Sequence, residues 1–274
     1  MKKRILALAA VSALTFALCG CSGSSSGDKG TEKESGKQVA SDLDYVKGNG
    51  KLVVGITNFE PMDYKDKDGK WIGFDAELAE KFAESIGVKA EFVEIDWGKK
   101  VLELDGKSID CVWNGMTLND EVKAAMSTSN AYCNNSQVVV LNKDVADKYS
   151  TVESLSELTF AVETGSTGKE QAEANKLKFT EVDKQADAIM EVAAGTSDGA
   201  IIDLLMASAM VGEGTSYENL TYTVKLNDEK YGVGFRKDSD ITAKLNEFLK
   251  DAYKDGTITG LSEKYGVKAL VVEQ

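Results

Sequence analysis

Histidine is absent from the 274 residues of this chain, and its absence removes much of the usual enzyme chemistry. A chain without histidine cannot build Ser-His-Asp or Cys-His catalytic groups, and it lacks a common ligand of zinc. Carboxylates remain available as acids and bases. We therefore predict a protein that is not an enzyme, with no catalytic residues, no metal site and no cofactor.

The chain is also poor in positive charge and in long apolar segments. It has 32 Lys and Arg residues against 45 Asp and Glu residues, a formal net charge of −13. An acidic protein is a poor partner for nucleic acids and for anionic membranes. After the N-terminal region, no segment approaches the roughly 20 apolar residues that a membrane-spanning helix needs.

The N-terminus has the pattern of an export signal. A basic start at residues 2–4 precedes an apolar run at 5–18, which is typical of a secretory signal peptide. The run ends in Leu18-Cys19-Gly20-Cys21, which resembles a bacterial lipobox. We predict cleavage before Cys21 and a lipid on its thiol, so that the protein is extracytoplasmic and anchored to the cell membrane. An ordinary signal peptide that contains cysteines is the alternative.

The segment that follows Cys21 is rich in serine, glycine and lysine. Such a composition cannot form a core, so we predict a signal peptide over residues 1–20 and a flexible tether over 21–49. Two cysteines remain, Cys111 and Cys133. An even number in an exported chain suggests a disulfide, and two buried free thiols are the alternative.

Short apolar runs alternate with helical periodicity through the rest of the chain. Strands are predicted at 51–56, 90–95, 109–113, 137–141, 160–162, 180–182, 199–202 and 231–235. Helices are predicted at 74–86, 98–105, 152–158, 184–194, 241–254 and 257–265, and from residue 169. This alternation is typical of βαβ units and indicates an α/β fold with two lobes.

Polar turns follow several of these strands, at 58–61, 114–117 and 163–167, and Asp203 ends another strand. Ligands of α/β folds lie beyond the carboxyl ends of the strands. The four strand ends would therefore form the walls of one cleft.

Several stretches of the sequence carry a resemblance to a known family. They are Phe59-Glu60-Pro61-Met62, GKWIGFDAEL at 69–78, Trp97, LDGKSID at 104–110, NGMT at 114–117, Ala131-Tyr132, VETGST at 162–167, AIID at 200–203 and YGVGFRK at 231–237. In this order and spacing they resemble the solute-binding lipoproteins of bacterial ABC transporters, in the polar amino acid uptake family. The resemblance covers nearly all of residues 51–266.

The resemblance implies a type II periplasmic-binding-protein fold. Each lobe would be a mostly parallel sheet flanked by helices, with two crossover strands at the hinge, near 137–142 and 223–226. Lobe 1 would be discontinuous, 50–137 with 227–274, and lobe 2 would be 138–226. A monomer of this kind closes on a polar amino acid by hinge motion and delivers it to the membrane subunits of an ABC permease.

The resemblance also implies a set of ligand-binding residues. They are Phe59, Glu60, Trp97, Asn114, Gly115, Thr117, Glu163, Ser166, Thr167 and Asp203. The aromatic rings would offer flat apolar faces, the turn at Ser166 and Thr167 would offer N–H groups to a carboxylate, and Asp203 would pair with an α-ammonium. Core packing, a helix cap and a structural ion pair are the respective alternatives.

The sequence departs from the family pattern at Val122, where the family usually has an arginine that grips the ligand's α-carboxylate. Valine cannot do this, and Lys123 is turned about 100° away on a helix. Three acidic residues would also bring negative charge to the predicted cleft, namely Glu60, Glu163 and Asp203.

Two interpretations of the ligand remain. An amino acid could be held through the N–H groups of Thr117, Ser166 and Thr167, with a cationic side chain facing an acid. The ligand could instead be an amine or another cationic or polar metabolite without an α-carboxylate. An enzyme that uses Glu163, or a sensor module on the same fold, are alternatives from other classes.

Overall fold

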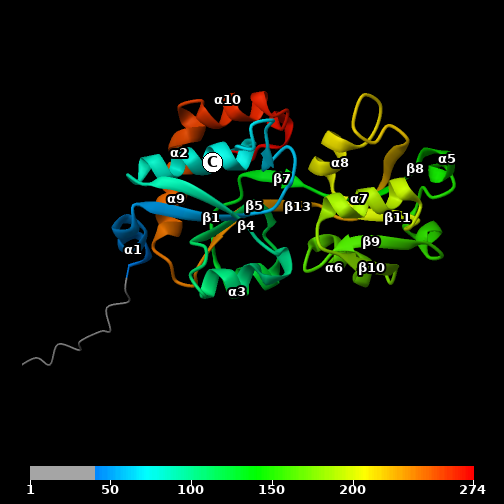
Figure 1. Cartoon of the computed structure of the whole chain (residues 1–274), viewed down its shortest axis with the longest axis horizontal. Coiled ribbons are helices and arrows are strands. Elements are labelled where there is room, and N and C mark those ends of the chain that lie inside the picture. The colour runs from blue at the N-terminus through cyan, green and yellow to red at the C-terminus, as the bar shows by residue number, and fades with distance from the viewer. Residues whose placement is uncertain (1–40) are drawn as a thin grey trace, which may run out of the picture. The chain divides into compact units, whose positions relative to one another are not determined.

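Two β-sheets organise residues 41–274, the part of the chain that the computed structural model describes (Figure 1). The predicted signal peptide, Cys21 and most of the predicted tether lie outside these residues. A separate two-stranded hairpin joins β2 (Tyr64–Lys65) to β3 (Trp71–Ile72).

The first sheet has the strand order β4-β1-β5-β13-β6, and β7 also pairs with β13. Its strands are β1 (Lys51–Ile56), β4 (Lys89–Glu94), β5 (Cys111–Thr117), β6 (Ser127–Thr128), β7 (Cys133–Asn135) and β13 (Glu229–Phe235). β1 runs parallel to β4 and β5, whereas β13 runs antiparallel to its neighbours. The sheet is therefore assembled from distant parts of the chain.

The second sheet has the order β10-β9-β11-β8-β12. Its strands are β8 (Gln137–Asn142), β9 (Thr159–Glu163), β10 (Lys178–Val182), β11 (Gly199–Asp203) and β12 (Leu220–Lys225). β9 is parallel to β10 and β11, and β8 is antiparallel to β11 and β12.

The α/β class predicted from the sequence is confirmed, but both sheets are mixed rather than mostly parallel. The chain passes between the sheets directly, through Ser136 after β7 and through residues 226–228 after β12. The four strands that these connections join all run antiparallel to their neighbours in their own sheet.

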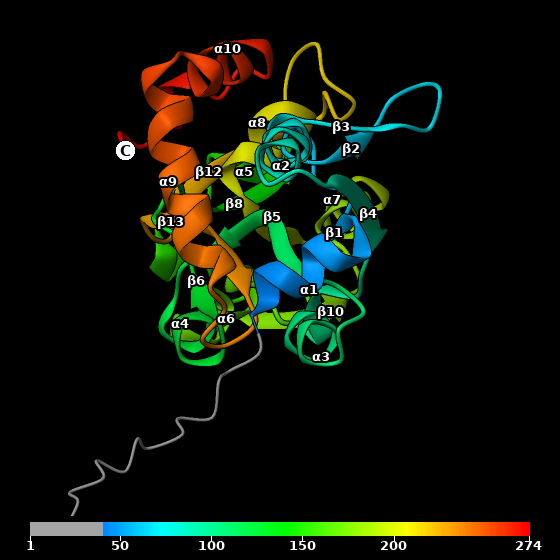
Figure 2. The same cartoon turned by 90° about the vertical axis from the view of Figure 1, so that its left-hand side faces the viewer.

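Helices cover the sheets. On the first sheet, α2 (Phe74–Ser85), α9 (Ile241–Lys254) and α10 (Thr257–Lys264) lie on one side, with α3 (Lys100–Asp105) and α4 (Asp120–Ala125) on the other (Figure 2). The second sheet carries α5 (Lys143–Ala146), α6 (Thr167–Ala174), α7 (Gln185–Ala194) and α8 (Leu204–Met210). Short 3-10 turns are η1 (Trp97–Lys99), η2 (Val152–Leu155) and η3 (Lys268–Leu270). None of the helices within residues 41–274 has the length and apolarity needed to cross a membrane.

Strand β5 is buried on both faces, which explains its unbroken apolar start. Cys111 and Trp113 pack on the side of α2, whereas Val112 and Met116 pack on the opposite side with Val122. Successive side chains of a strand point to opposite faces, so a strand between two helical layers is apolar throughout. This packing fixes the polar end of β5, residues 114–117, at the edge of the sheet.

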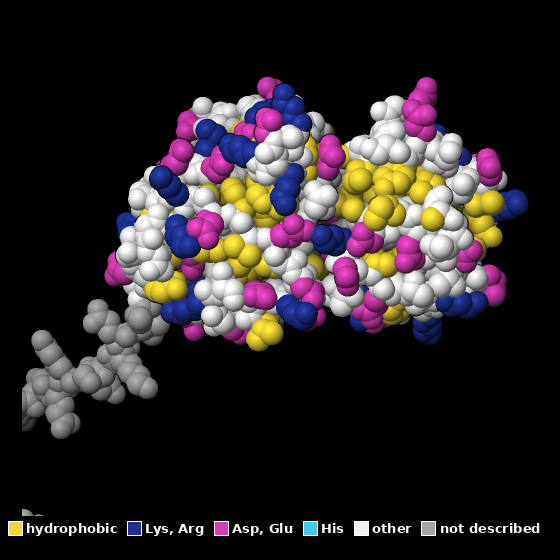
Figure 3. Space-filling model, in the orientation of Figure 1, with side chains coloured by type: hydrophobic (Ala, Val, Ile, Leu, Met, Phe, Trp, Pro, Cys, Tyr) yellow, Lys and Arg dark blue, Asp and Glu magenta, His cyan; other side chains and the backbone are white. Residues whose placement is uncertain are grey.

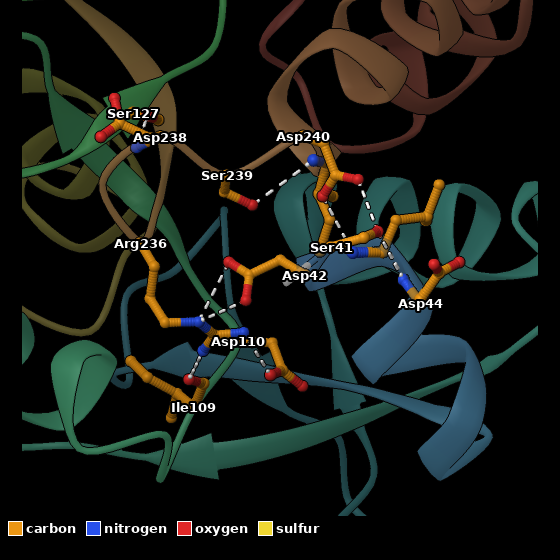
Figure 4. A network of polar contacts seen from close by, with 12 residues as sticks. Ser41, Asp42, Asp44, Ile109, Asp110, Ser127, Arg236, Asp238, Ser239 and Asp240 are labelled. Atoms are coloured by element: carbon orange, nitrogen blue, oxygen red, sulfur yellow. Dashed lines mark hydrogen bonds and ion pairs between the residues drawn. The ribbon is translucent and has the colours of Figure 1, made fainter. Parts of the chain in front are cut away.

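The predicted tether ends earlier than expected, because residues 42–49 form helix α1 (Asp42–Asn49). Ser41 caps this helix, and its hydroxyl donates a hydrogen bond to Asp240 at 2.6 Å. Arg236 donates to both carboxylate oxygens of Asp42, to Asp110 and to the Ile109 carbonyl (Figure 4). Contacts with residues about 200 positions away therefore hold a helix whose own sequence is weakly apolar.

The possible disulfide between Cys111 and Cys133 is not formed, and both thiols are free and buried. Strands β5 and β7 lie on opposite sides of β13. Cys111 on β5 is paired with Phe235 of β13, and Cys133 on β7 is paired with Tyr231. Two strand spacings amount to roughly 10 Å. A disulfide requires Cα atoms within about 7 Å, so the alternative of two buried thiols holds.

Candidate functional site

The carboxyl ends of β5, β9 and β11 enclose a cavity of about 40 Å³ between the two sheets. It is lined by Trp97, Lys100, Val101, Asn114, Gly115, Met116, Thr117, Asn119, Glu121, Val122, Gln137, Glu163, Gly165, Ser166, Thr167, Glu170, Gln185 and Asp203. A cavity of this volume holds only a few water molecules. A larger ligand therefore enters only if side chains at the rim, or the two sheets, move apart.

The end of β5 brings backbone groups to the cavity. Gly115 has a φ of 55°, and its N–H donates to Asp75 at 2.7 Å. The side-chain amide of Asn114 is engaged with Thr57, accepting from its N–H at 2.7 Å and donating to its hydroxyl at 2.8 Å. Asn114 thus ties β5 to the end of β1, and Thr117 completes this wall.

Two predicted residues do not line the cavity. Phe59 is 2% exposed and lies behind Gly115, where its ring packs edge-on against Tyr231. A Cβ at position 115 would lie 2.3 Å from Cε1 of Phe59, so the missing side chain of the glycine makes room for the ring. Core packing, the structural alternative, therefore describes Phe59.

Glu60 lies in a separate hollow together with Tyr64, Leu205 and Lys264. The chain turns back after Phe59, because the N–H of Asp63 donates to the Phe59 carbonyl at 2.8 Å, and this turn carries Glu60 away from the strand end. Glu60 therefore does not line the cavity.

The second sheet contributes two buried carboxyl groups, both of which the sequence predicted. Glu163 ends β9 and is 3% exposed, and Asp203 ends β11 and is 4% exposed. Loss of hydration raises the pKa of Glu163 to about 8, and the charge of Asp203 adds to the shift. Burial, with Glu229 nearby, also raises the pKa of Asp203. The two groups thus strongly favour a neighbouring positive charge.

Asp203 is already well supplied with hydrogen bonds. Its oxygens accept from the side chains of Asn135, Tyr231 and Gln185. Its own N–H donates to the Gln185 side-chain carbonyl at 2.9 Å. An ionised carboxylate can accept about four hydrogen bonds, so room remains for one donor from a ligand.

The turn between β9 and α6 brings Ser166 and Thr167 to the cavity. The hydroxyl of Ser166 accepts from the N–H of Lys169 at 3.2 Å and caps the helix. The side chain of Ser166 therefore has the capping role that was its structural alternative. The first N–H groups of a helix have no partner within it, and Thr167 is the first residue of α6.

Lys100, which begins α3, also lines the cavity and was not predicted from the sequence. Its Nζ lies 2.9 Å from the Gly165 carbonyl, 3.3 Å from the Trp97 carbonyl and 4.7 Å from the centre of the Trp97 ring. Lys100 lies three residues after Trp97, one helical turn, and this spacing is the signal that could have found it. Asn119, Glu121, Gln137, Glu170 and Gln185 were also missed.

Val122 lines the cavity through an apolar side chain. It is 5% exposed and belongs to a cluster with Trp97 and Met116. Lys123 is exposed and does not line the cavity, so it does not replace the arginine of the family pattern.

Two side-chain contacts join elements of the two sheets, one at the cavity and one in a separate hollow. The Asn119 side chain donates to Glu170 at 2.7 Å, and Lys184 pairs with Glu94 at 2.5 Å. Side chains of both charges lie close together along the junction of the two sheet regions (Figure 3). No cluster of three or more metal-ligating side chains occurs within residues 41–274. The arrangement is that of a small cavity with a largely polar lining between the two sheets.

Comparisons with known proteins agree with this description. Residues 52–268 match the bacterial extracellular solute-binding proteins, family 3. The arginine-binding extracellular protein ArtP of Bacillus subtilis (strain 168) is 30% identical over 274 residues, which cover 97% of this chain and 98% of ArtP.

Solved structures give the same result. A substrate-binding protein of an ABC uptake transporter from Streptococcus pneumoniae, with bound histidine, has a TM-score of 0.78 at 28% identity, covering 85% of this chain and 99% of that chain. The ancestral amino acid-binding protein AncCDT-1, a precursor of cyclohexadienyl dehydratase, has a TM-score of 0.75 at 31% identity, covering 82% and 99%. These similar proteins are described as binding proteins, although the ancestral one precedes an enzyme.

Proposed function

This chain belongs to the bacterial extracellular solute-binding proteins of family 3, and we propose that its cargo is an amino acid with a positively charged side chain. Its fold is the type II periplasmic-binding-protein fold, and its role is extracytoplasmic capture of an amino acid for an ABC importer.

The observation that carries the proposal is the pair of buried carboxyls, Glu163 and Asp203, in the cavity wall. A buried carboxylate is costly unless a cation compensates it. In the proposed complex Asp203 accepts a hydrogen bond from the α-ammonium, and Glu163 faces the side-chain cation. The N–H groups of Thr117 and Thr167 face the α-carboxylate. The arginine binding for which ArtP is named supports the same class of ligand.

Val122 favours a second candidate, because valine cannot bind the ligand's α-carboxylate as the usual arginine of the family does. Under this alternative the cargo is an amine or another small cation without an α-carboxylate, enclosed beside Trp97. Both candidates bind their positive charge through Glu163 and Asp203. They differ only in whether the site also binds an α-carboxylate of the ligand.

A thermal-shift screen separates the candidates. The purified protein is unfolded and refolded to remove carried ligand. It is then mixed with arginine, lysine or ornithine, with agmatine, cadaverine or putrescine, and with neutral amino acids. A ligand that binds the folded state raises Tm according to its excess over Kd. The proposal expects shifts with the amino acids and smaller shifts with the matching amines. Shifts with the amines alone would favour the alternative, and shifts with neutral amino acids alone would contradict both.

The same experiment addresses catalysis. The proposal treats the chain as a binding protein, so ligand recovered after prolonged incubation should be chemically intact by mass spectrometry. A converted ligand would indicate an enzyme on this fold.

We further propose that the protein is a monomer held at the membrane by a lipid on Cys21. Its lobes would be residues 50–137 with 227–274, and residues 138–226, hinged at Ser136 and residues 226–228. The motif at residues 18–21 and the division of the strands between two sheets support these assignments. Cys21→Ser should release the protein from membranes to the medium, and retention of that variant at the membrane would refute the lipid anchor.

A further inference from the structure

Lys100 is the only lysine or arginine among the described residues that line the cavity. It is half-buried, and loss of hydration lowers its pKa, although Glu163 and other acids oppose this effect. A positive charge placed in such a site needs a compensating partner. The groups of the chain that contact Lys100 therefore show whether its charge is already compensated.

The partners of Lys100 are carbonyl groups and an aromatic ring. Two of its three N–H donors go to the carbonyls of Gly165 and Trp97. Within residues 41–274, Lys100 makes no ion pair with a carboxylate at 4.0 Å or less, whereas Lys99 next to it pairs with Asp96 at 2.7 Å. One N–H donor of Lys100 is thus left for a ligand.

The residues around Val122 are compatible with contact between Lys100 and a ligand. Val122, Val101 and Met116 form an apolar wall beside Trp97, and Lys100 enters the cavity next to that wall. An arginine at position 122 would place a second cation in the same small space. With valine there, Lys100 has no competing cation among the described lining residues.

We infer that Lys100 binds the α-carboxylate of the cargo and so supplies the charge that Val122 cannot. This inference rests on the proposed function, since it requires a cargo with a carboxylate. The ammonium would approach the carboxylate from the first sheet, while the start of α6 approaches it from the second. Lys100 would then decide whether the site prefers an amino acid over the matching amine.

The test measures Kd for each amino acid and its matching amine by calorimetry, using the purified protein and its Lys100→Met variant. We expect Lys100→Met to weaken binding of the amino acid about 10- to 100-fold, as for the loss of one charge-assisted hydrogen bond. Binding of the amine should be unchanged or tighter, because removal of Lys100 also removes repulsion of a cation. Lys99→Met is the matched control and should change neither Kd.

Three further outcomes would contradict the inference. Equal weakening of amino acid and amine would overturn it, because Lys100 would then act by joining the sheets through Gly165. An unchanged Kd for the amino acid would also overturn it. Lys100→Arg should keep the preference for the amino acid, and loss of that preference in a variant with normal Tm would contradict a role for the charge.

Failure of the proposed function gives a different result. If the unmodified protein binds no amino acid with a carboxylate, both the proposed function and this inference fall. If it binds one and Lys100→Met binds it equally well, only the inference falls.

Discussion

Glu163 shows how a single buried residue can link ligand binding to the stability of the protein. Its pKa rises from an ordinary value of 4.5 to about 8, chiefly because it is removed from water. In the pH range between these values the folded protein keeps a proton that the unfolded chain releases. The stability of the ligand-free protein should therefore fall as pH rises through this window.

Glu163→Gln tests this link. A glutamine does not titrate, so between pH 5 and pH 8 the variant should gain about 3 kcal/mol relative to the unmodified protein. Denaturant unfolding of the ligand-free proteins at both pH values measures this gain. Glu84→Gln, at an exposed glutamate, should show no such change. Parallel pH profiles for Glu163→Gln and the unmodified protein would show that burial does not raise this pKa.

Gly115 is a second residue whose role is set by its surroundings. Gly115→Ala combines a positive φ with an overlap against Phe59, and should destabilise the fold by about 3 kcal/mol. Gly195→Ala is the matched control, because Gly195 has a φ of 72° and open space around it. The control should cost about 1 kcal/mol, from strain alone. Equal losses by denaturant unfolding would mean that the Phe59 ring moves aside without cost.

At the scale of elements, helix α1 depends on one buried guanidinium. Asp42→Ala removes the carboxylate that Arg236 binds, and should loosen α1 while the sheets stay folded. Hydrogen exchange should become at least tenfold faster in residues 44–49, since local opening needs less free energy than global unfolding. Asp44→Ala, at an exposed residue of the same helix, is the control. Uniformly faster exchange across both sheets would show that α1 is part of the global folding unit.

The elements also show how far the sequence predicts the molecule. The apolar runs locate β1, β5, β9 and β11. Residues 114–117, predicted as a turn, form the end of β5 instead, and they line one cavity together with the turn after β9 and Asp203, whereas the turn at 58–61 does not line it. Helix α1 could not be predicted, because Arg236 and Asp240 stabilise it from far along the chain. Phe59 was misplaced because no local pattern shows that its ring would fill the space that Gly115 leaves.

Lys100 illustrates the same limit within the site. A lysine beside another lysine, at the start of a short helix, has the pattern of an exposed residue. Its position in the cavity follows from the close approach of η1 to the turn at Gly165, where a Cβ at position 165 would lie 2.9 Å from the Gly98 Cα. Periodicity and composition do not encode such contacts between distant segments, so the charge balance of the cavity emerged only from the structure.

At the scale of the whole molecule, ligand entry requires side chains at the rim or the two sheets themselves to move apart, because the cavity volume is only about 40 Å³. The ion pair of Lys184 with Glu94 bridges the two sheets. Its members are 40% and 36% exposed, so its contribution is small, about 0.5 kcal/mol. That contribution acts on the balance between open and closed forms, and through it on affinity.

Lys184→Met should therefore raise Kd for the cargo about two- to threefold, with little change in the free energy of unfolding. Lys178→Met is the matched control, because Lys178 pairs with Glu157 away from the cavity. The larger effect should lie in the dissociation rate measured by stopped-flow fluorescence, since opening precedes release of the ligand. A Kd that changes equally in both variants would trace the effect to net charge. A change in Lys184→Met alone would identify closure of the two sheets as the step that retains the ligand.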